Sequence, residues 1–298
     1  MIISQLIGGL GNQMFEYAAG FVAASHHQTA YKLDNLYYQD HSKRFHRFCY
    51  RPYGLELFNI SAKIATPDEI KLFTYPRVHN KYLFHLLRRF HKDKNVVNEH
   101  DIKTYNDLIN VPSNCYLRGF YQKYEFFKDA LPSLKKEFTF KEALPATHNK
   151  IVSLIENAHE PICVVFRRGD YVGHPTLDIV NLDFYYEGLR YIVNTRQTDR
   201  QTDVFVFSDD IEWCKHSFKP AQYKTTFVDQ RFTGPLGGFY LQLMMKCSHF
   251  IIPNSTYPYW AALLAPYKDK IVVAPRIWYK GQPETTINSI LPPHWIAL

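Results

Sequence analysis

One short stretch constrains this chain more than any other: an apolar run that leads directly into two arginines, a glycine and an aspartate. Residues 162–166 predict a buried strand, and Arg167, Arg168, Gly169 and Asp170 follow it. In open α/β sheets, ligands bind beyond the carboxyl ends of the strands. Two guanidinium forks there suit a phosphate or diphosphate, because each can donate paired hydrogen bonds to an oxyanion. A solvated surface salt bridge has the same pattern, and this stretch alone favours neither interpretation.

The composition is that of a globular protein with a preference for anionic partners. The 298 residues, of which 46% are hydrophobic, suffice for one large domain or two medium ones. A net charge of +7 favours nucleotides, nucleic acid or an acidic membrane surface as partners. The five cysteines form no CxxC pair and the histidines show no HExxH spacing, so the sequence predicts no metal site.

The N-terminus and one basic segment bear on location. The N-terminus lacks the basic region of a signal peptide, and no apolar run reaches the ~18 residues of a membrane span. We therefore expect a cytoplasmic protein. Residues 81–92 combine an apolar stripe with basic residues, as in a helix on an anionic membrane. A helix packed into the core has the same stripe and is the favoured interpretation, with peripheral contact to the inner membrane as the alternative.

A glycine-rich turn follows the first predicted strand. Residues 2–7 predict a strand, residues 8–11 (Gly-Gly-Leu-Gly) a turn, and Asn12 the cap of a helix. This strand, glycine loop and helix are typical of nucleotide-binding α/β proteins. Met14 stands where the dinucleotide fingerprint has its third glycine, however, and no Gly-Lys-Ser/Thr completes a phosphate-binding loop. A turn required only for packing would have the same sequence.

Strand and helix signals alternate after residue 161, which is the pattern of a parallel sheet. Asp209 and Glu212 predict a capping box at the start of one helix. We place the domain boundary in the proline-punctuated stretch before residue 161, which gives domains 1–150 and 151–298. The strands are predicted at 162–166, 204–207, 249–252 and 271–274, and helices near 183–195, at 237–246 and from 256.

Polar residues follow three of these strands. Because the carboxyl ends of parallel strands share one edge of the sheet, we expect the three sets to meet at a nucleotide-binding crevice. Each set alone is also a common helix-capping signal, but their joint occurrence favours the ligand site. The adjacent acids lack the one-residue spacing of a metal-binding Asp-x-Asp, and arginine charge makes a divalent ion unnecessary. The sets are Arg167, Arg168 and Asp170; Ser208, Asp209 and Asp210; and Asn254, Ser255 and Thr256.

Taken together, these motifs resemble the bacterial alpha-1,2-fucosyltransferases. The resemblance spans essentially the whole chain and rests on residues 8–15 (GGLGNQMF), 166–172 (FRRGDYV), 207–213 (FSDDIEW), 254–256 (NST) and 259–260 (YW). It implies an α/β fold of the GT-B type, in which two Rossmann-like domains hold the nucleotide-sugar in a cleft. It also implies an inverting transfer of L-fucose from GDP-fucose to the 2-hydroxyl of a galactoside, without metal or cofactor.

The resemblance assigns roles to individual residues. One or both of Arg167 and Arg168 are expected to contact the donor β-phosphate. Asp170 and His174 are the candidate bases, although a dissociative transfer can proceed without a base. The first domain is expected on the acceptor side, and the second to bind GDP-fucose. The acceptor is expected to be a galactose-terminated oligosaccharide or a lipid-linked glycan. The remaining donor-binding residues are expected to be Gly9, Gly11, Asn12, Gln13, Asp209, Asp210, Asn254, Ser255 and Thr256.

One departure and two alternatives accompany this interpretation. The family motif has a histidine where this chain has Val165, which predicts altered nucleotide affinity or compensation by another side chain. The first alternative is a related nucleotide-sugar transferase with another donor or linkage. The second is a nucleic-acid-binding protein, suggested by the aromatic and basic segment 43–53. That alternative leaves the three polar strand ends unexplained, so we expect no nucleic-acid partner.

Overall fold

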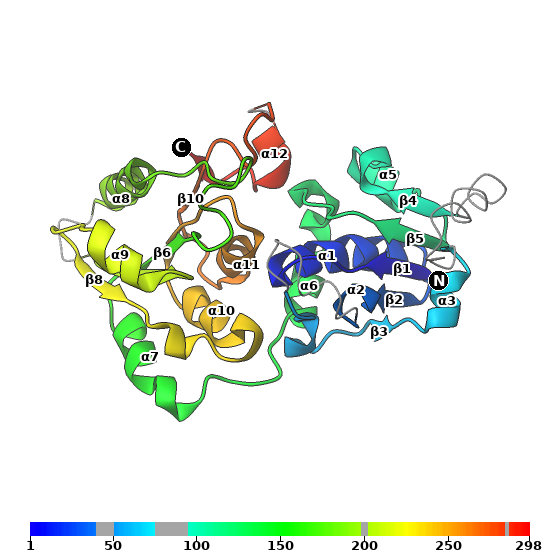
Figure 1. Cartoon of the computed structure of the whole chain (residues 1–298), viewed down its shortest axis with the longest axis horizontal. Coiled ribbons are helices and arrows are strands. Elements are labelled where there is room, and N and C mark those ends of the chain that lie inside the picture. Colours follow the sequence, from blue (N-terminus) through cyan, green and yellow to red (C-terminus); the bar gives the residue numbers. More distant parts are fainter. Residues whose placement is uncertain (40–50, 75–94, 198–201, 284–285) are drawn as a thin grey trace. The chain divides into compact units, whose positions relative to one another are not determined.

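The chain folds into two α/β units, each built on a parallel sheet of its own (Figure 1). The computed structural model describes residues 1–39, 51–74, 95–197, 202–283 and 286–298. The described residues up to Thr139 form the first unit, and those from Phe140 to Leu298 form the second. The boundary predicted from the sequence, at residue 150, falls within the helix α7 (Asn149–Glu156) of the second unit.

The first unit contains a five-stranded parallel sheet with α1 (Leu10–His26) lying along β1 and β2 (Figure 1). The strands in their order across the sheet are β3 (Lys63–Ile64), β2 (Tyr31–Asp34), β1 (Ile2–Gln5), β5 (Cys115–Arg118) and β4 (Val96–Asn98). Shorter helices of this unit are α2 (Leu36–Gln39), α3 (Pro67–Lys71), α5 (Tyr105–Ile109) and α6 (Leu131–Glu137).

The second unit contains a six-stranded sheet in the doubly wound order. All of its strand pairs are parallel, so the parallel sheet predicted for this half of the chain is confirmed. The direction of the strand order reverses between β6 and β9, which is the switch point of such sheets. The strands in order are β11 (Ile296–Ala297), β10 (Val272–Ala274), β9 (His249–Ile251), β6 (Ile162–Phe166), β7 (Asp203–Ser208) and β8 (Lys224–Phe227).

Helices cover both faces of this second sheet. On one face, alternate residues of β6 and β7 join a single core cluster with α8 (Leu182–Arg196) and α9 (Ile211–Ser217). On the other face, Phe207 of β7 meets Tyr240 of α10 (Gly238–Met245), with the ring centroids 5.3 Å apart. The neighbouring α11 (Thr256–Leu264) is buried from Pro258 onward, so it has no polar face. The short α12 (Ile287–Ile290) lies near the C-terminus of the chain.

Two predicted helix caps are wrong. The residue that precedes α1 is Gly9, whereas Asn12 lies inside the helix and its Oδ1 accepts a hydrogen bond from Gln122 Nε2 at 3.1 Å. The cap of α9 is Asp210, whose carboxylate accepts the backbone N–H of Trp213 at 3.2 Å. In both cases the side chain that the local sequence pattern assigned to the cap bonds instead to a residue distant in the sequence. Asn12 bonds to Gln122, and Asp209 bonds to Arg167.

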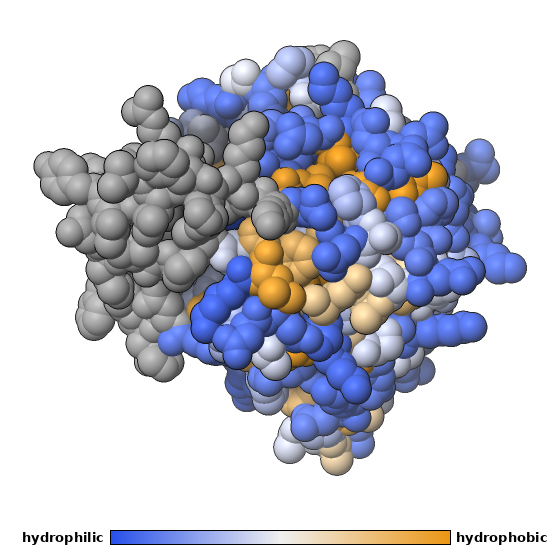
Figure 2. Space-filling model, turned by 90° about the vertical axis from the view of Figure 1, so that its right-hand side faces the viewer, coloured by the Kyte–Doolittle hydropathy of each residue, from blue (hydrophilic) through white to orange (hydrophobic). Residues whose placement is uncertain are grey.

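Two sequence features that bear on partners lie outside the described residues. These are the helix expected at 81–92 and most of the aromatic and basic segment 43–53, so membrane contact stays a prediction. Among the residues that are described, no helix is long and apolar enough to cross a membrane. Figure 2 shows one largely polar face on which hydrophobic residues lie in a few separate areas among polar ones. Ile64 and Leu72 are exposed hydrophobic residues of the first unit.

Candidate functional site

The polar strand ends predicted from the sequence do share one edge of the second sheet. β6 pairs in parallel with β7, where Phe166 lies beside Ser208, and also with β9. The loop after β6 therefore begins beside the residues that follow β7 and β9. Because the strand order reverses between β6 and β9, this is the position at which doubly wound sheets bind ligands.

Arg167 is held by two carboxylates. Its Nη1 donates to Oδ2 of Asp209 at 2.6 Å, and its Nη2 donates to Asp170. The guanidinium carbon also lies 5.4 Å from the ring centre of Tyr171. The side chain is only 22% exposed, which distinguishes this arrangement from a solvated surface pair. Arg167 is thus fixed in orientation by groups from two strand ends.

The Asp209 carboxylate also accepts hydrogen bonds from the backbone of the loop that follows β6. Its Oδ1 accepts the N–H of Arg168 at 2.8 Å, and its Oδ2 accepts the N–H of Gly169 at 3.2 Å. A Cβ atom on Gly169 would stand 2.9 Å from that Oδ2. The close approach of this carboxylate therefore favours glycine at position 169, because any larger residue would displace it.

Arg168 is held on two sides and differs from its neighbour. Its Nε donates to Oδ2 of Asp210 at 3.2 Å, and its guanidinium carbon lies 3.5 Å from the ring centre of Trp213. Within the described residues, its Nη1 and Nη2 make no hydrogen bond. The edge that carries these two nitrogens can donate to an oxyanion in a bidentate manner.

Asn254, expected from the sequence to contact the ligand, is a buried link between loops. Its side chain is 2% exposed, and its Nδ2 donates to the carbonyls of Leu177 at 3.2 Å and Trp278 at 2.9 Å. The backbone carbonyl of Asn254 accepts a hydrogen bond from the hydroxyl of Tyr171 at 3.1 Å. Burial raises the pKa of Tyr171, so the phenol stays neutral and can donate. Asn254 therefore joins the loops that follow β6, β9 and β10.

Ser255 and Thr256 occupy the start of α11. Ser255 is the residue before the helix, and its buried side chain makes no capping hydrogen bond. Backbone N–H groups in the first turn of a helix have no partner within the helix and favour anions. This helix start follows β9 directly, so it lies on the same edge as the arginines.

The candidate bases and Val165 have defined surroundings. Asp170 is paired with Arg167, and Nδ1 of His174 accepts the backbone N–H of Thr176 at 3.2 Å. Either role as a base stays a prediction. Val165, at the motif's usual histidine position, is a buried residue of β6. Among the described residues, no group of three histidines, cysteines or acids is placed to hold a metal ion.

The residues expected from the glycine turn form a separate set in the first unit. Gly9, Gly11, Asn12 and Gln13 all lie at the start of α1. Gln13 is fully buried: its Nε2 donates to the carbonyls of Gly8 and Pro52 at 3.2 and 3.0 Å, and its Oε1 accepts the N–H of Gly54 at 2.8 Å. The Gln13 amide therefore fastens the turn to residues 52–54.

A buried carboxyl supports the same turn and is not predicted by the sequence motifs. Glu16 Oε2 accepts the N–H of Ile7 at 3.0 Å, and its Oε1 has no hydrogen-bond partner. Burial raises the pKa of Glu16 well above its usual range, which favours the protonated form of this carboxyl. The sequence signal that could have identified Glu16 is its position among the buried residues of α1, where a carboxyl is unusual.

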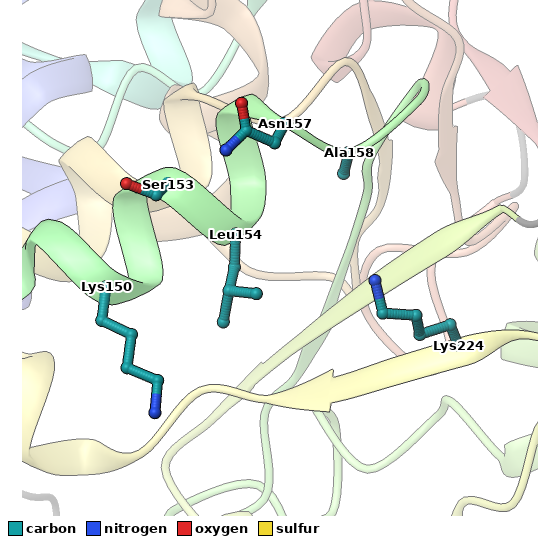
Figure 3. Close-up of a pocket in the computed structure, with 6 residues that line it drawn as sticks. All are labelled: Lys150, Ser153, Leu154, Asn157, Ala158 and Lys224. Atoms are coloured by element: carbon teal, nitrogen blue, oxygen red, sulfur yellow. The ribbon is translucent and has the colours of Figure 1, made fainter.

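A surface pocket of about 300 Å³ lies elsewhere on the second unit (Figure 3). It is formed between α7 and the start of β8, where Lys224 pairs with Asp203. Asp203 and Lys224 are the first residues of β7 and β8, so the pocket lies at the amino end of the sheet, opposite the end that carries the arginines. It is lined by Lys150, Ser153, Leu154, Asn157, Ala158 and Lys224.

Comparison with known proteins connects this geometry to a sequence family. The family model described as glycosyl transferase family 11 matches residues 66–298. The O-antigen biosynthesis glycosyltransferase WbnK of Escherichia coli is 30% identical, with 96% of this chain and 97% of that protein covered. An alpha-1,2-colitosyltransferase of Escherichia coli is 26% identical over 100% and 99% of the two chains. Human galactoside alpha-(1,2)-fucosyltransferase 1 is 27% identical over 50% of this chain and 42% of its own.

Solved structures of similar fold are fucosyltransferases. The fucosyltransferase NodZ from Bradyrhizobium aligns with a TM-score of 0.51 at 13% identity, covering 89% of this chain and 92% of its own. POFUT1 in complex with GDP-fucose aligns with a TM-score of 0.50 at 12% identity, covering 91% and 96%. At such identities the likeness concerns the fold, which is a mixed α/β architecture with parallel sheets.

Proposed function

The chain belongs to glycosyl transferase family 11, and we propose that it transfers L-fucose from GDP-fucose to the 2-hydroxyl of a galactoside, with inversion and without a metal ion. The observation that carries the proposal is the oriented pair Arg167 and Arg168 at the switch point of the second sheet. In this proposal the second unit binds the donor, the first unit serves the acceptor, and the two make a GT-B arrangement.

The arginines act on the leaving group. When the bond between fucose C1 and the β-phosphate oxygen breaks, negative charge develops on GDP while the sugar gains oxocarbenium character. Guanidinium groups already held in place stabilise that charge without reorganising, which lowers the barrier. Carboxylates fix Arg167, while Nη1 and Nη2 on the open edge of Arg168 can donate hydrogen bonds to two phosphate oxygens. Ser255 and Thr256 at the start of α11 supply further donors to the phosphates.

The acceptor completes the displacement. Its 2-hydroxyl oxygen attacks C1 from the face opposite GDP, which converts a β-linked donor into an α-linked product. The hydroxyl proton passes to a base, for which Asp170 and His174 are the candidates, or to water. Asp170 is engaged with Arg167, so its availability as a base depends on that pair opening when the donor binds.

A second candidate differs only in the sugar. A relative that matches this chain over its full length is an alpha-1,2-colitosyltransferase, so an activated colitose is the alternative donor. The arginines recognise the diphosphate and do not distinguish the two sugars. A panel of nucleotide-sugars, followed by linkage analysis of the product, would separate the candidates.

We expect the protein to bind GDP and not to bind UDP. Calorimetry on the intact chain should show one GDP site that weakens when either arginine is removed. Transfer assays with GDP-fucose and a galactoside should then give a product with a 1,2 linkage by NMR. Tight UDP binding in the absence of GDP binding would overturn the assignment of the donor.

Transfer is expected to survive EDTA. The charge that a divalent ion would stabilise on a diphosphate is assigned here to Arg167 and Arg168. Initial rates measured with chelator, and again after adding excess Mg²⁺ or Mn²⁺, should agree. A rate that disappears in EDTA and returns with the metal would contradict this assignment.

Gly169→Ala is expected to weaken GDP binding by roughly tenfold, a difference of about 1.4 kcal/mol. The new methyl group would stand 2.9 Å from Oδ2 of Asp209 and displace the carboxylate that orients Arg167. In an Asp209→Ala background the same substitution should have little further effect, because the clash is gone. Equal losses in both backgrounds would show that the glycine serves some other purpose.

A further inference from the structure

The start of α9 presents two residues to Arg168, and one carboxylate connects them. Oδ1 of Asp210 accepts the backbone N–H of Trp213, which caps the helix, while Oδ2 accepts Nε of Arg168. The cap thus fixes the position of Trp213 relative to Asp210. Both residues follow β7, whereas Arg168 follows β6. The contact therefore spans two neighbouring strand ends.

Trp213 covers one face of the guanidinium group. The guanidinium carbon lies 3.5 Å from the ring centre, which is the separation of a close stack. The ring itself packs against the core of the second unit and meets Phe166 edge-on, with centroids 6.0 Å apart. Because this packing holds the indole, Arg168 rests on a fixed surface and not on a mobile side chain.

We propose that Trp213 and Asp210 are positioning residues that aim the terminal nitrogens of Arg168 at a nucleoside diphosphate. Asp210 occupies the Nε side, Trp213 occupies one face, and the remaining edge carries Nη1 and Nη2. This inference rests on the proposed function for the identity of the ligand. It gives Asp210 a role different from the direct donor contact expected from the sequence, and it gives a role to Trp213, to which the sequence assigned none.

A double-mutant cycle tests the inference. Trp213→Leu should weaken GDP binding about tenfold in the otherwise unchanged protein, because a desolvated stack on arginine is lost. Trp213→Phe retains an aromatic face and should weaken binding less. In an Arg168→Ala background, Trp213→Leu should change GDP affinity little, since there is no guanidinium left to position. A tryptophan that serves only the core would weaken binding equally in both backgrounds, and that result would overturn the inference.

Tyr186→Leu is the matched control for lost packing. Tyr186 is also a partly buried aromatic residue of this core, but in the described part of the chain its contacts are with Phe218 and the Lys219 backbone and not with Arg168. It should lower the thermal midpoint without changing GDP affinity. If it weakens GDP binding as much as Trp213→Leu does, the effect is a general loosening of the core and the inference fails.

The stack can also be tested without any ligand. The difference between the emission spectra of the unchanged protein and Trp213→Phe isolates the fluorescence of Trp213. Arg168→Ala should shift this emission to longer wavelength, because the exposed indole face gains water. An unchanged spectrum would overturn the inference whatever the protein binds. GDP binding with a non-additive cycle but no fucose transfer would overturn the proposed reaction alone, whereas absence of GDP binding would overturn both.

Discussion

Arg167→Ala and Arg168→Ala are each expected to lower turnover by about 10²-fold or more, the scale seen when a donor to developing charge is removed. Either change removes a guanidinium group that the protein holds in place before the leaving group becomes charged. Lysine should restore little activity at either position, because a point charge cannot replace a fork. Steady-state rates with GDP-fucose would give kcat and KM for each variant.

The control for this experiment is another arginine of the same unit. Arg190 lies exposed on α8 and has no partner among the described residues, so Arg190→Ala should leave kcat and KM unchanged. Thermal melts of all variants would show whether they fold. If both site variants melt normally and retain near-normal rates, the arginine pair is structural and the proposed mechanism is wrong.

Asn254→Asp is expected to lower the free energy of unfolding of the second unit by about 3–5 kcal/mol, as for other uncompensated buried charges. The new carboxylate would face the carbonyls of Leu177 and Trp278, which now accept hydrogen bonds from the amide. Burial would raise its pKa above the unfolded value of about 3.9. The stability loss should therefore be largest at neutral pH and diminish as the pH falls and the group is protonated.

Asn288→Asp provides the matched control for the same chemical change. Asn288 is exposed on α12, so its substitution should shift the thermal midpoint little at any pH. Urea unfolding between about pH 5 and pH 8 would compare the stabilities of the two variants. An ordinary aspartate is ionised throughout this range, so a pH dependence would report a raised pKa at position 254. A midpoint for Asn254→Asp equal to that of the control would mean that the loops do not depend on this amide.

The fold was predictable where the strands are continuous apolar runs. β6 and β7 are buried along their whole length, which is why residues 162–166 and 204–207 stand out. β2 and β3 do not stand out, because they are only four and two residues long and contain the charged residues Lys32 and Lys63. β2 and β3 are strands because they pair with neighbouring strands, and the local sequence does not show which distant segments will pair.

The site was predictable in its members more than in their roles. The sequence places Arg168, Asp209 and Asn254 at strand ends, and parallel pairing brings those ends together. It does not show where each side chain points. Asp209 turns to Arg167 and leaves the helix cap to Asp210, while Asn254 turns inward to two carbonyls. These choices depend on partners tens of residues away.

The strand order of the second unit also has a consequence for how the chain is made. β6 needs β9 beside it, yet α8, β7, α9, β8 and α10 are all synthesised between the two. Contacts so distant in the sequence form late, because the intervening chain must first be ordered. Until Ile251 leaves the ribosome, one edge of the apolar strand β6 lacks its partner and can pair with another chain. Slow translation of this segment, or truncation within it, should therefore favour aggregation.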